Sequence, residues 1–164
     1  MDDPAVVLEA AARFLEARSR SVVEVRRRLV SVGYQAELVE AAITRLAGLG
    51  MLDDEAFARA WVESRDRARP RGERAMRDEL RLKGLDREIV DRVLQARAAE
   101  GETPPDLAAA ERLLEKHARS LARVTDPRQR RQRAYALLAR NGFDPETCRE
   151  VAATVIDRSD PDTD

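Results

Sequence analysis

The sequence predicts an all-α protein made of three tandem three-helix repeat units that form an elongated, curved molecule. Ala, Leu, Arg and Glu dominate its 164 residues, and these residues are among the better helix formers. Aromatic residues make up only 4%, with seven glycines and seven prolines, which argues against an all-β protein. One motif also recurs three times, and tandem units that contact mainly their neighbours form extended, curved shapes.

The repeated motif is centred on glycines 33, 84 and 142. It reads "VRRRLVSVGYQAELVEAAI" over residues 25–43, "MRDELRLKGLDREIVDRVL" over 76–94 and "AYALLARNGFDPETCREVA" over 134–152. Each copy has a leucine four residues before the glycine and a large apolar residue directly after it. Glycine readily adopts the left-handed conformation that ends a helix, and the apolar residue then folds back onto the leucine. Because helical spacing of apolar residues resumes after the turn, each copy predicts helix, turn, helix.

A further helix is expected before each of these pairs. The first covers residues 5–17, the second begins at Asp53, and the third follows Pro104-Pro105 and continues through Leu121. The predicted domains are therefore three three-helix units over residues 1–50, 51–100 and 104–157, followed by an acidic disordered tail over 158–164. The acidic stretch "AAEGETPPD" between the second and third units is the expected linker.

The second unit contains the only tryptophan of the chain, Trp61, four residues after Phe57. Large aromatic residues at helical spacing usually face a core, so we expect Trp61 to be buried against the other two helices of its unit. The alternative is an exposed aromatic platform on which nucleic-acid bases stack.

Basic residues are clustered although the net charge is only −1. Residues 59–83 contain nine basic and five acidic residues, and residues 119–140 contain seven basic and one acidic residue. Such faces attract nucleic acid or an acidic protein surface, and guanidinium groups pair well with phosphate and carboxylate. The alternative is a solvated face of ion pairs with neighbouring acids. The candidate partner- or DNA-binding residues are Arg65, Arg69, Arg71, Arg74, Arg128, Arg130, Arg131 and Arg133.

The sequence gives little support to an enzyme. Its only histidine, His117, is expected to face solvent on a helix, and its only cysteine, Cys148, stands at an apolar position of the repeat. One Cys and one His exclude a Cys/His zinc site, so no catalytic residue, metal or cofactor is predicted.

No apolar run approaches the roughly 18 residues of a membrane span, which predicts a soluble, cytoplasmic protein. The helices after each glycine are acidic or apolar, which argues against sequence-specific reading of DNA.

The middle of the chain resembles the RecX family of proteins that regulate the RecA recombinase. The resemblance rests on "GMLDDEAFARAWVESR" followed by "RGERAMRDELRLKGLDREIVDRVL", and it extends to "SRSVVEVRRRLVSVGY" in the first unit. It covers residues 10 to 156, and its third unit, "RNGFDPETCREV", keeps the Gly-Phe pair but departs after it.

The resemblance implies a non-enzymatic negative modulator of RecA. Members of the family lodge in the groove of the RecA filament on single-stranded DNA and inhibit ATP hydrolysis, strand exchange and co-protease activity. It also implies roles in DNA repair, recombination and the SOS response, and we expect a monomer with at most weak direct DNA contact. Two alternatives stay open at this point: a non-specific DNA-binding protein that uses arginine–phosphate contacts, and a helical adaptor for another partner.

Overall fold

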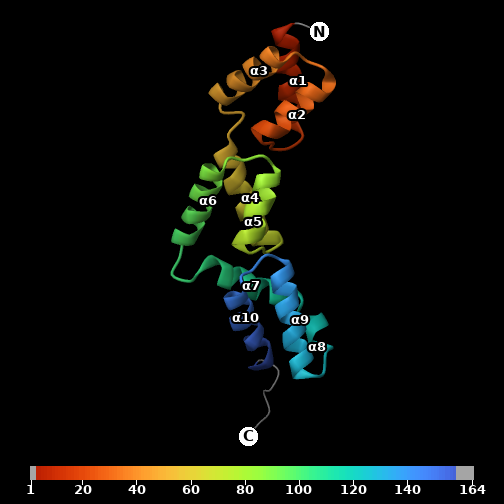
Figure 1. The fold of residues 1–164 in the computed structure, drawn as a ribbon, viewed down its shortest axis with the longest axis vertical. Helices are drawn as coiled ribbons and strands as arrows, with labels where there is room; N and C mark the ends of the chain where they lie inside the picture. Colours follow the sequence, from red (N-terminus) through yellow and green to blue (C-terminus); the bar gives the residue numbers. More distant parts are fainter. Residues whose placement is uncertain (1–2, 158–164) are drawn as a thin grey trace. The chain divides into compact units, whose positions relative to one another are not determined.

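The computed structural model describes residues 3–157, and its secondary structure over these residues is entirely helical. The predicted all-α class is therefore confirmed, and the predicted tail at 158–164 lies outside the described residues. Over this range the chain forms ten helices (Figure 1): α1 (Pro4–Glu16), α2 (Val22–Val32), α3 (Ala36–Gly48), α4 (Asp54–Ala68), α5 (Glu73–Leu82), α6 (Arg87–Ala99), α7 (Pro105–Lys116), α8 (Ala118–Ala122), α9 (Pro127–Arg140) and α10 (Pro145–Asp157).

The three predicted glycine turns are confirmed. Gly33, Gly84 and Gly142 have φ angles of 99°, 81° and 85°, the left-handed region that other residues rarely adopt. The next residue in each case donates its N–H to the carbonyl of the leucine four residues before the glycine, at 3.3, 3.2 and 3.3 Å. These bonds satisfy carbonyls that the end of a helix would otherwise leave unpaired.

Side-chain caps fix where the helices begin. Ser21 and Glu24 form a capping box at the start of α2. Asp53 accepts the N–H groups of residues 55 and 56 at 3.0 and 3.1 Å and is therefore the cap of α4. Asp144 likewise caps α10, and its hydrogen bonds from Thr147 lower the pKa of its carboxyl group.

Apolar faces of the helices form the cores. In the first unit, α1, α2 and α3 bury residues Val7, Ala11, Val25, Leu29, Val39, Ala42, Ile43 and Leu46. In the third, α7 to α10 bury residues Ala109, Ala110, Leu113, Leu114, Leu121, Ala134, Leu138, Phe143, Cys148, Val151 and Ala152. The leucines before the turn glycines and the apolar positions of the helices after them are thus buried, whereas Tyr34 is only partly buried. Burial of this kind is the main driving force of folding.

Two expectations were wrong in detail. The helix after Pro105 does not continue through Leu121, because His117 has φ −104° and ψ 7° and separates α7 from the short α8. The bend brings Leu121 onto the core of the third unit, where it is 6% exposed. Trp61 is only half-buried, whereas Phe57 is 5% exposed. Its indole Nε1–H donates to Glu79 at 2.7 Å, so the ring lies at the edge of the core with its polar atom bonded.

Contacts divide the chain into two compact units, and the division passes through the three middle helices. One consists of Met1–Trp61 with Glu79–Val93, and the other of Val62–Asp78 with Leu94–Asp164. Each contains a connection between the start of one helix and the glycine turn of the next repeat.

In the first compact unit, the start of α2 is held by the second repeat. The Ser21 hydroxyl donates to the carbonyl oxygen of Lys83 at 2.6 Å, and the N–H of Val22 donates to Asp54 Oδ1 at 2.9 Å. Burial raises the pKa of the Asp54 carboxyl group, although the bond from Val22 opposes that shift. We call this set of contacts the first joint.

In the second compact unit, the start of α5 is held by the third repeat in the same way. The N–H of Gly72 donates to the carbonyl oxygen of Asn141 at 2.9 Å, and the N–H of Glu73 donates to Asp106 Oδ2 at 2.9 Å. Gly72 follows Ser21 by 51 positions, as Gly84 follows Gly33, so the two sites are equivalent in the repeat. We call this set of contacts the second joint.

Both joints press a helix start against a turn glycine. A Cβ atom on Gly84 would lie 2.6 Å from Val23 Cβ, and one on Gly142 would lie 2.3 Å from Ala75 Cβ. The turn at Gly33 has no such neighbour, since nothing lies within 4 Å of a Cβ added there. Among the described residues, the turn of the first repeat is therefore the one that no preceding repeat covers.

Candidate functional site

The arginines predicted in the second unit divide into two kinds. Arg69 is exposed directly after α4 and has no ion pair with a described residue, and Arg65 is half-buried on α4. Arg71 donates from Nη1 to Asn141 Oδ1 at 2.8 Å, and Arg74 donates from Nη2 to the carbonyl of Ala139 at 3.4 Å. The last two therefore contact the carboxyl end of α9, where a positive charge is favourable.

Asp66, an acid of this region, belongs to a buried ionic cluster. The Arg97 side chain is 6% exposed at the end of α6, and its Nε and Nη2 donate to the two oxygens of Asp66 at 2.9 and 2.8 Å. Its Nη1 donates to Asp106 at 2.6 Å, and Arg112 lies 3.7 Å from Asp66. These contacts raise the pKa of Arg97 against the opposing effect of burial.

This cluster, which sequence reasoning did not find, also contains the acceptor of the second joint. Asp106 was expected in a linker, yet one of its oxygens binds Arg97 while the other accepts the N–H of Glu73 at the start of α5. Arg97 and Asp66 are 31 residues apart, and no local pattern marks either as buried. Both oxygens of Asp66 accept from Arg97, so this acid is part of the fold.

The arginines of the third unit stand at the start of α9. Arg128, Arg131 and Arg133 are exposed and have no ion pair with a described residue. The first turn of α9 contains no acid, and cations near a helix N-terminus are unfavourable because of the helix dipole. Helical spacing places Arg128 and Arg131 on one side and Arg133 on the other. The described residues therefore provide no ion-pair partner for these three arginines.

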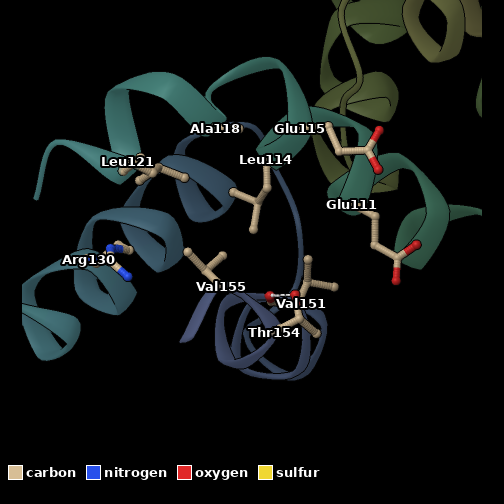
Figure 2. Close-up of a pocket in the computed structure, with 10 residues that line it drawn as sticks. Glu111, Leu114, Glu115, Ala118, Leu121, Arg130, Val151, Thr154 and Val155 are labelled. Carbon is tan, nitrogen blue, oxygen red and sulfur yellow. Dashed lines mark hydrogen bonds between the residues drawn. The ribbon is translucent and has the colours of Figure 1, made fainter. Parts of the chain in front are cut away.

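Arg130 differs from these three. It is half-buried, and its Nε donates to the carbonyl of Val124 at 2.9 Å. It also lines a cavity of about 230 Å³ between α7, α8, α9 and α10. Figure 2 shows Leu114 and Val155 pointing into this cavity, with Arg130 on one side of it and Glu111 and Glu115 on the other. Part of the Arg130 guanidinium group is therefore used within the fold.

The candidate residues for chemistry are placed as follows. Cys148 is fully buried, as its repeat position predicted, and burial raises the pKa of its thiol. His117 is half-buried, not solvent-facing, and its Nδ1 lies 3.0 Å from the carbonyl of Leu113. Over residues 3–157, no group of three or more His, Cys, Asp or Glu side chains is arranged to hold a metal ion. None of the helices described is both long and apolar enough to cross a membrane.

Comparison with known families gives three matches along the chain. The domain described as "RecX, first three-helix domain" matches residues 8–46. The domain described as "RecX, second three-helix domain" matches residues 53–94, and "RecX, third three-helix domain" matches residues 105–152. The matches fall in the order of the three predicted repeat units and together cover more than half of the chain.

Curated relatives and solved structures agree with these matches. The regulatory protein RecX of Mycobacterium avium (strain 104) is 34% identical over 141 residues, which are 85% of this chain and 78% of that protein. That of Mycolicibacterium vanbaalenii is 35% identical over 150 residues, covering 88% of this chain and 79% of the relative. The crystal structure of RecX from Lactobacillus salivarius has a TM-score of 0.78 at 19% identity, over 94% of this chain and 97% of that one. At that identity the likeness shows the fold alone.

Proposed function

Because this chain belongs to the RecX family of regulatory proteins, we propose that it is a negative regulator of the RecA recombinase in the cytoplasm. In this proposal it binds in the groove of the RecA filament on single-stranded DNA. It thereby inhibits ATP hydrolysis, strand exchange and co-protease activity. The observation that carries the proposal is the match of three consecutive RecX domains in the correct order.

The side chains of the third unit support a surface for an acidic partner. Arg128 and Arg131 are exposed on one side of α9, and no described acid pairs with them. Asp126 caps α9 and offsets the positive end of the helix dipole, but no described acid pairs with the two guanidinium groups, which leaves them available to a binding partner. Their partner is either an acidic face of the filament or its DNA phosphates, and Arg69 in the second unit offers the same chemistry.

We expect inhibition of the RecA ATPase on single-stranded DNA when this protein is present well below one molecule per RecA protomer. A filament-bound regulator that contacts several protomers acts at such ratios. The measurement is a titration of the protein into preformed filaments, with its affinity for the naked strand determined at the same salt concentration. Inhibition only at amounts that saturate the DNA would contradict the proposal and favour a non-specific DNA-binding protein, whose affinity falls steeply with salt.

The second prediction concerns the arginines on α9. The double substitution Arg128→Glu with Arg131→Glu should weaken inhibition by roughly tenfold or more, because two attractive contacts become repulsive. Both side chains are exposed, so the helical content should stay at the wild-type value. The unfolding midpoint should equal or slightly exceed that of the wild type, because an acid in the first turn of α9 is favourable. We leave Arg130 unchanged because its Nε–H bond to Val124 belongs to the fold.

The matched control reverses the same number of charges elsewhere. Arg27 and Arg45 are exposed on α2 and α3 and have no ion pair with a described residue. Arg27→Glu with Arg45→Glu changes the net charge equally and should leave inhibition near the wild-type value. Equal losses in the two double variants would show that net charge, and not this part of α9, governs binding.

A further inference from the structure

A hollow of about 400 Å³ lies beside the uncovered turn of the first repeat. Its lining includes Ala10 and Phe14 from α1, Arg28 and Val32 from α2, and Tyr34 from the turn that follows. A volume of this size is within the range of sites that take small ligands or single large side chains. The lining combines apolar and aromatic side chains with two arginines, Arg13 and Arg28, of which Arg13 forms an ion pair with Glu9.

The second repeat has an aromatic side chain at the equivalent place. Trp61 stacks with Phe57 at 5.9 Å between ring centroids, donates from Nε1 to Glu79, and has Lys83 Nζ 5.3 Å from its ring centroid. All of these residues belong to the first compact unit, as does the hollow.

The repeat register relates the two places residue by residue. Trp61, Glu79 and Lys83 each follow a residue of the hollow by 51 positions, the offset that relates Gly84 to Gly33. The corresponding residues in the hollow are Ala10, Arg28 and Val32. The first repeat therefore has residues at the same repeat positions around the hollow, although their chemistry differs, and at the position of the indole ring it has only the methyl group of Ala10.

The substitutions also indicate the charge that an occupant needs. Glu79, which accepts the indole N–H in the second repeat, is replaced by Arg28 in the first. Arg28 is exposed and has no ion pair with a described residue, and the guanidinium group of Arg20 lies 4.2 Å from the ring centroid of Phe14. The surroundings are cationic, which favours a carboxylate beside the inserted ring.

We propose that this hollow is a docking site for a partner protein segment that inserts an aromatic side chain next to an acidic residue. The ring takes the place that Trp61 fills in the second repeat, and the acid pairs with Arg28. Aromatic anchors in preformed pockets commonly dominate the affinity of an interface. The proposal goes beyond the regulation of RecA, and its test needs no RecA.

The probe is the blocked peptide acetyl-Asp-Trp-Glu-amide, with acetyl-Asp-Ala-Glu-amide as its control. The measurement is a titration of the isotope-labelled full chain followed by amide chemical shifts. We expect the tryptophan peptide to shift the resonances of Ala10, Phe14, Val32 and Tyr34, and the alanine peptide to have no effect. No shifts at millimolar peptide, or shifts that lie elsewhere, would overturn the proposal.

Two variants make the test specific. Ala10→Trp fills the hollow as the second repeat does, so it should abolish the shifts while the circular dichroism spectrum stays helical. Arg28→Glu leaves the apolar core unchanged but reverses a charge in the lining of the hollow, and it should weaken peptide binding by about fivefold. It keeps the test valid if Ala10→Trp does not fold. Undiminished peptide binding by either folded variant would contradict the proposal. It would also be contradicted if raising the protein concentration alone caused the same shifts, because a second copy of the chain would then be the occupant.

Discussion

The substitution Gly142→Ala should lower the free energy of unfolding by about 2–5 kcal/mol, because it combines backbone strain with a steric conflict. Gly142 has φ 85°, where a non-glycine residue is strained by about 1–2 kcal/mol. The added Cβ atom would also lie 2.3 Å from Ala75 Cβ and 2.6 Å from the backbone nitrogen of Ala75. Relief requires the start of α5 to move away from the turn, which disrupts the second joint.

Substitutions at two other glycines measure the backbone strain and the steric conflict separately. Gly33→Ala places alanine at φ 99° with nothing within 4 Å of the new Cβ atom, so it should cost only the strain of about 1–2 kcal/mol. Gly72→Ala involves no positive φ, but its Cβ atom would lie 2.2 Å from the carbonyl oxygen of Gly142. It should cost about 1–3 kcal/mol through overpacking alone.

The measurement is urea denaturation of the three variants, followed by circular dichroism of the helical signal. The expected order of stability loss places Gly142→Ala first. If Gly142→Ala and Gly33→Ala have the same stability, the close approach of the turn to Ala75 does not contribute, and the second joint is looser than described. Helical propensity affects none of these comparisons strongly, since all three sites lie outside helix interiors.

These glycines also show what a sequence can predict. The turns at Gly33, Gly84 and Gly142 follow from local chemistry, because a positive φ, a preceding leucine and a following apolar residue are all within six positions. The same local pattern cannot distinguish the uncovered Gly33 from the packed Gly142. That difference depends on Ala75, which is far away in the sequence.

For the candidate interaction residues too, some features follow from the local sequence and others depend on tertiary packing. Exposure of Arg128, Arg131 and Arg133 was predictable, since Asp126 is the one acid among residues 119–140. The internal bonds of Arg71 and Arg130 were not, because each depends on a partner whose position is set by tertiary packing. The elongated, curved shape stays a prediction, as do the domain limits taken from the sequence.

Trp61 is a third case. The sequence predicted its position nearly correctly but not the hydrogen bond that its indole N–H makes. Its helical spacing from Phe57 placed it on the inner face of α4, but the indole N–H requires a partner when it is desolvated. Glu79 provides that partner at the edge of the core. The equivalent place in the first repeat has Ala10 and Arg28, which line the hollow beside the turn.

The largest effect of a single side chain is expected at Arg97. Arg97→Ala should lower the free energy of unfolding by about 3–5 kcal/mol, the cost of leaving carboxylates without their partner in a buried site. The side chains of Asp66 and Asp106 are only 26% and 19% exposed, so water replaces the lost guanidinium group poorly. The loss should be observed as a lower urea midpoint and a lower thermal midpoint.

Arg92→Ala on the same helix is the matched control. Its side chain is 57% exposed and makes one ion pair, with Glu55 at 3.4 Å, so its removal should cost at most about 1 kcal/mol. Salt provides a second criterion, because exposed pairs are screened while buried ones are screened much less. In 1 M NaCl the effect of Arg92→Ala should vanish and that of Arg97→Ala should persist. Since Asp106 joins Arg97 to the N–H of Glu73, a small effect of Arg97→Ala would mean that this ionic cluster adds little to the stability of the fold.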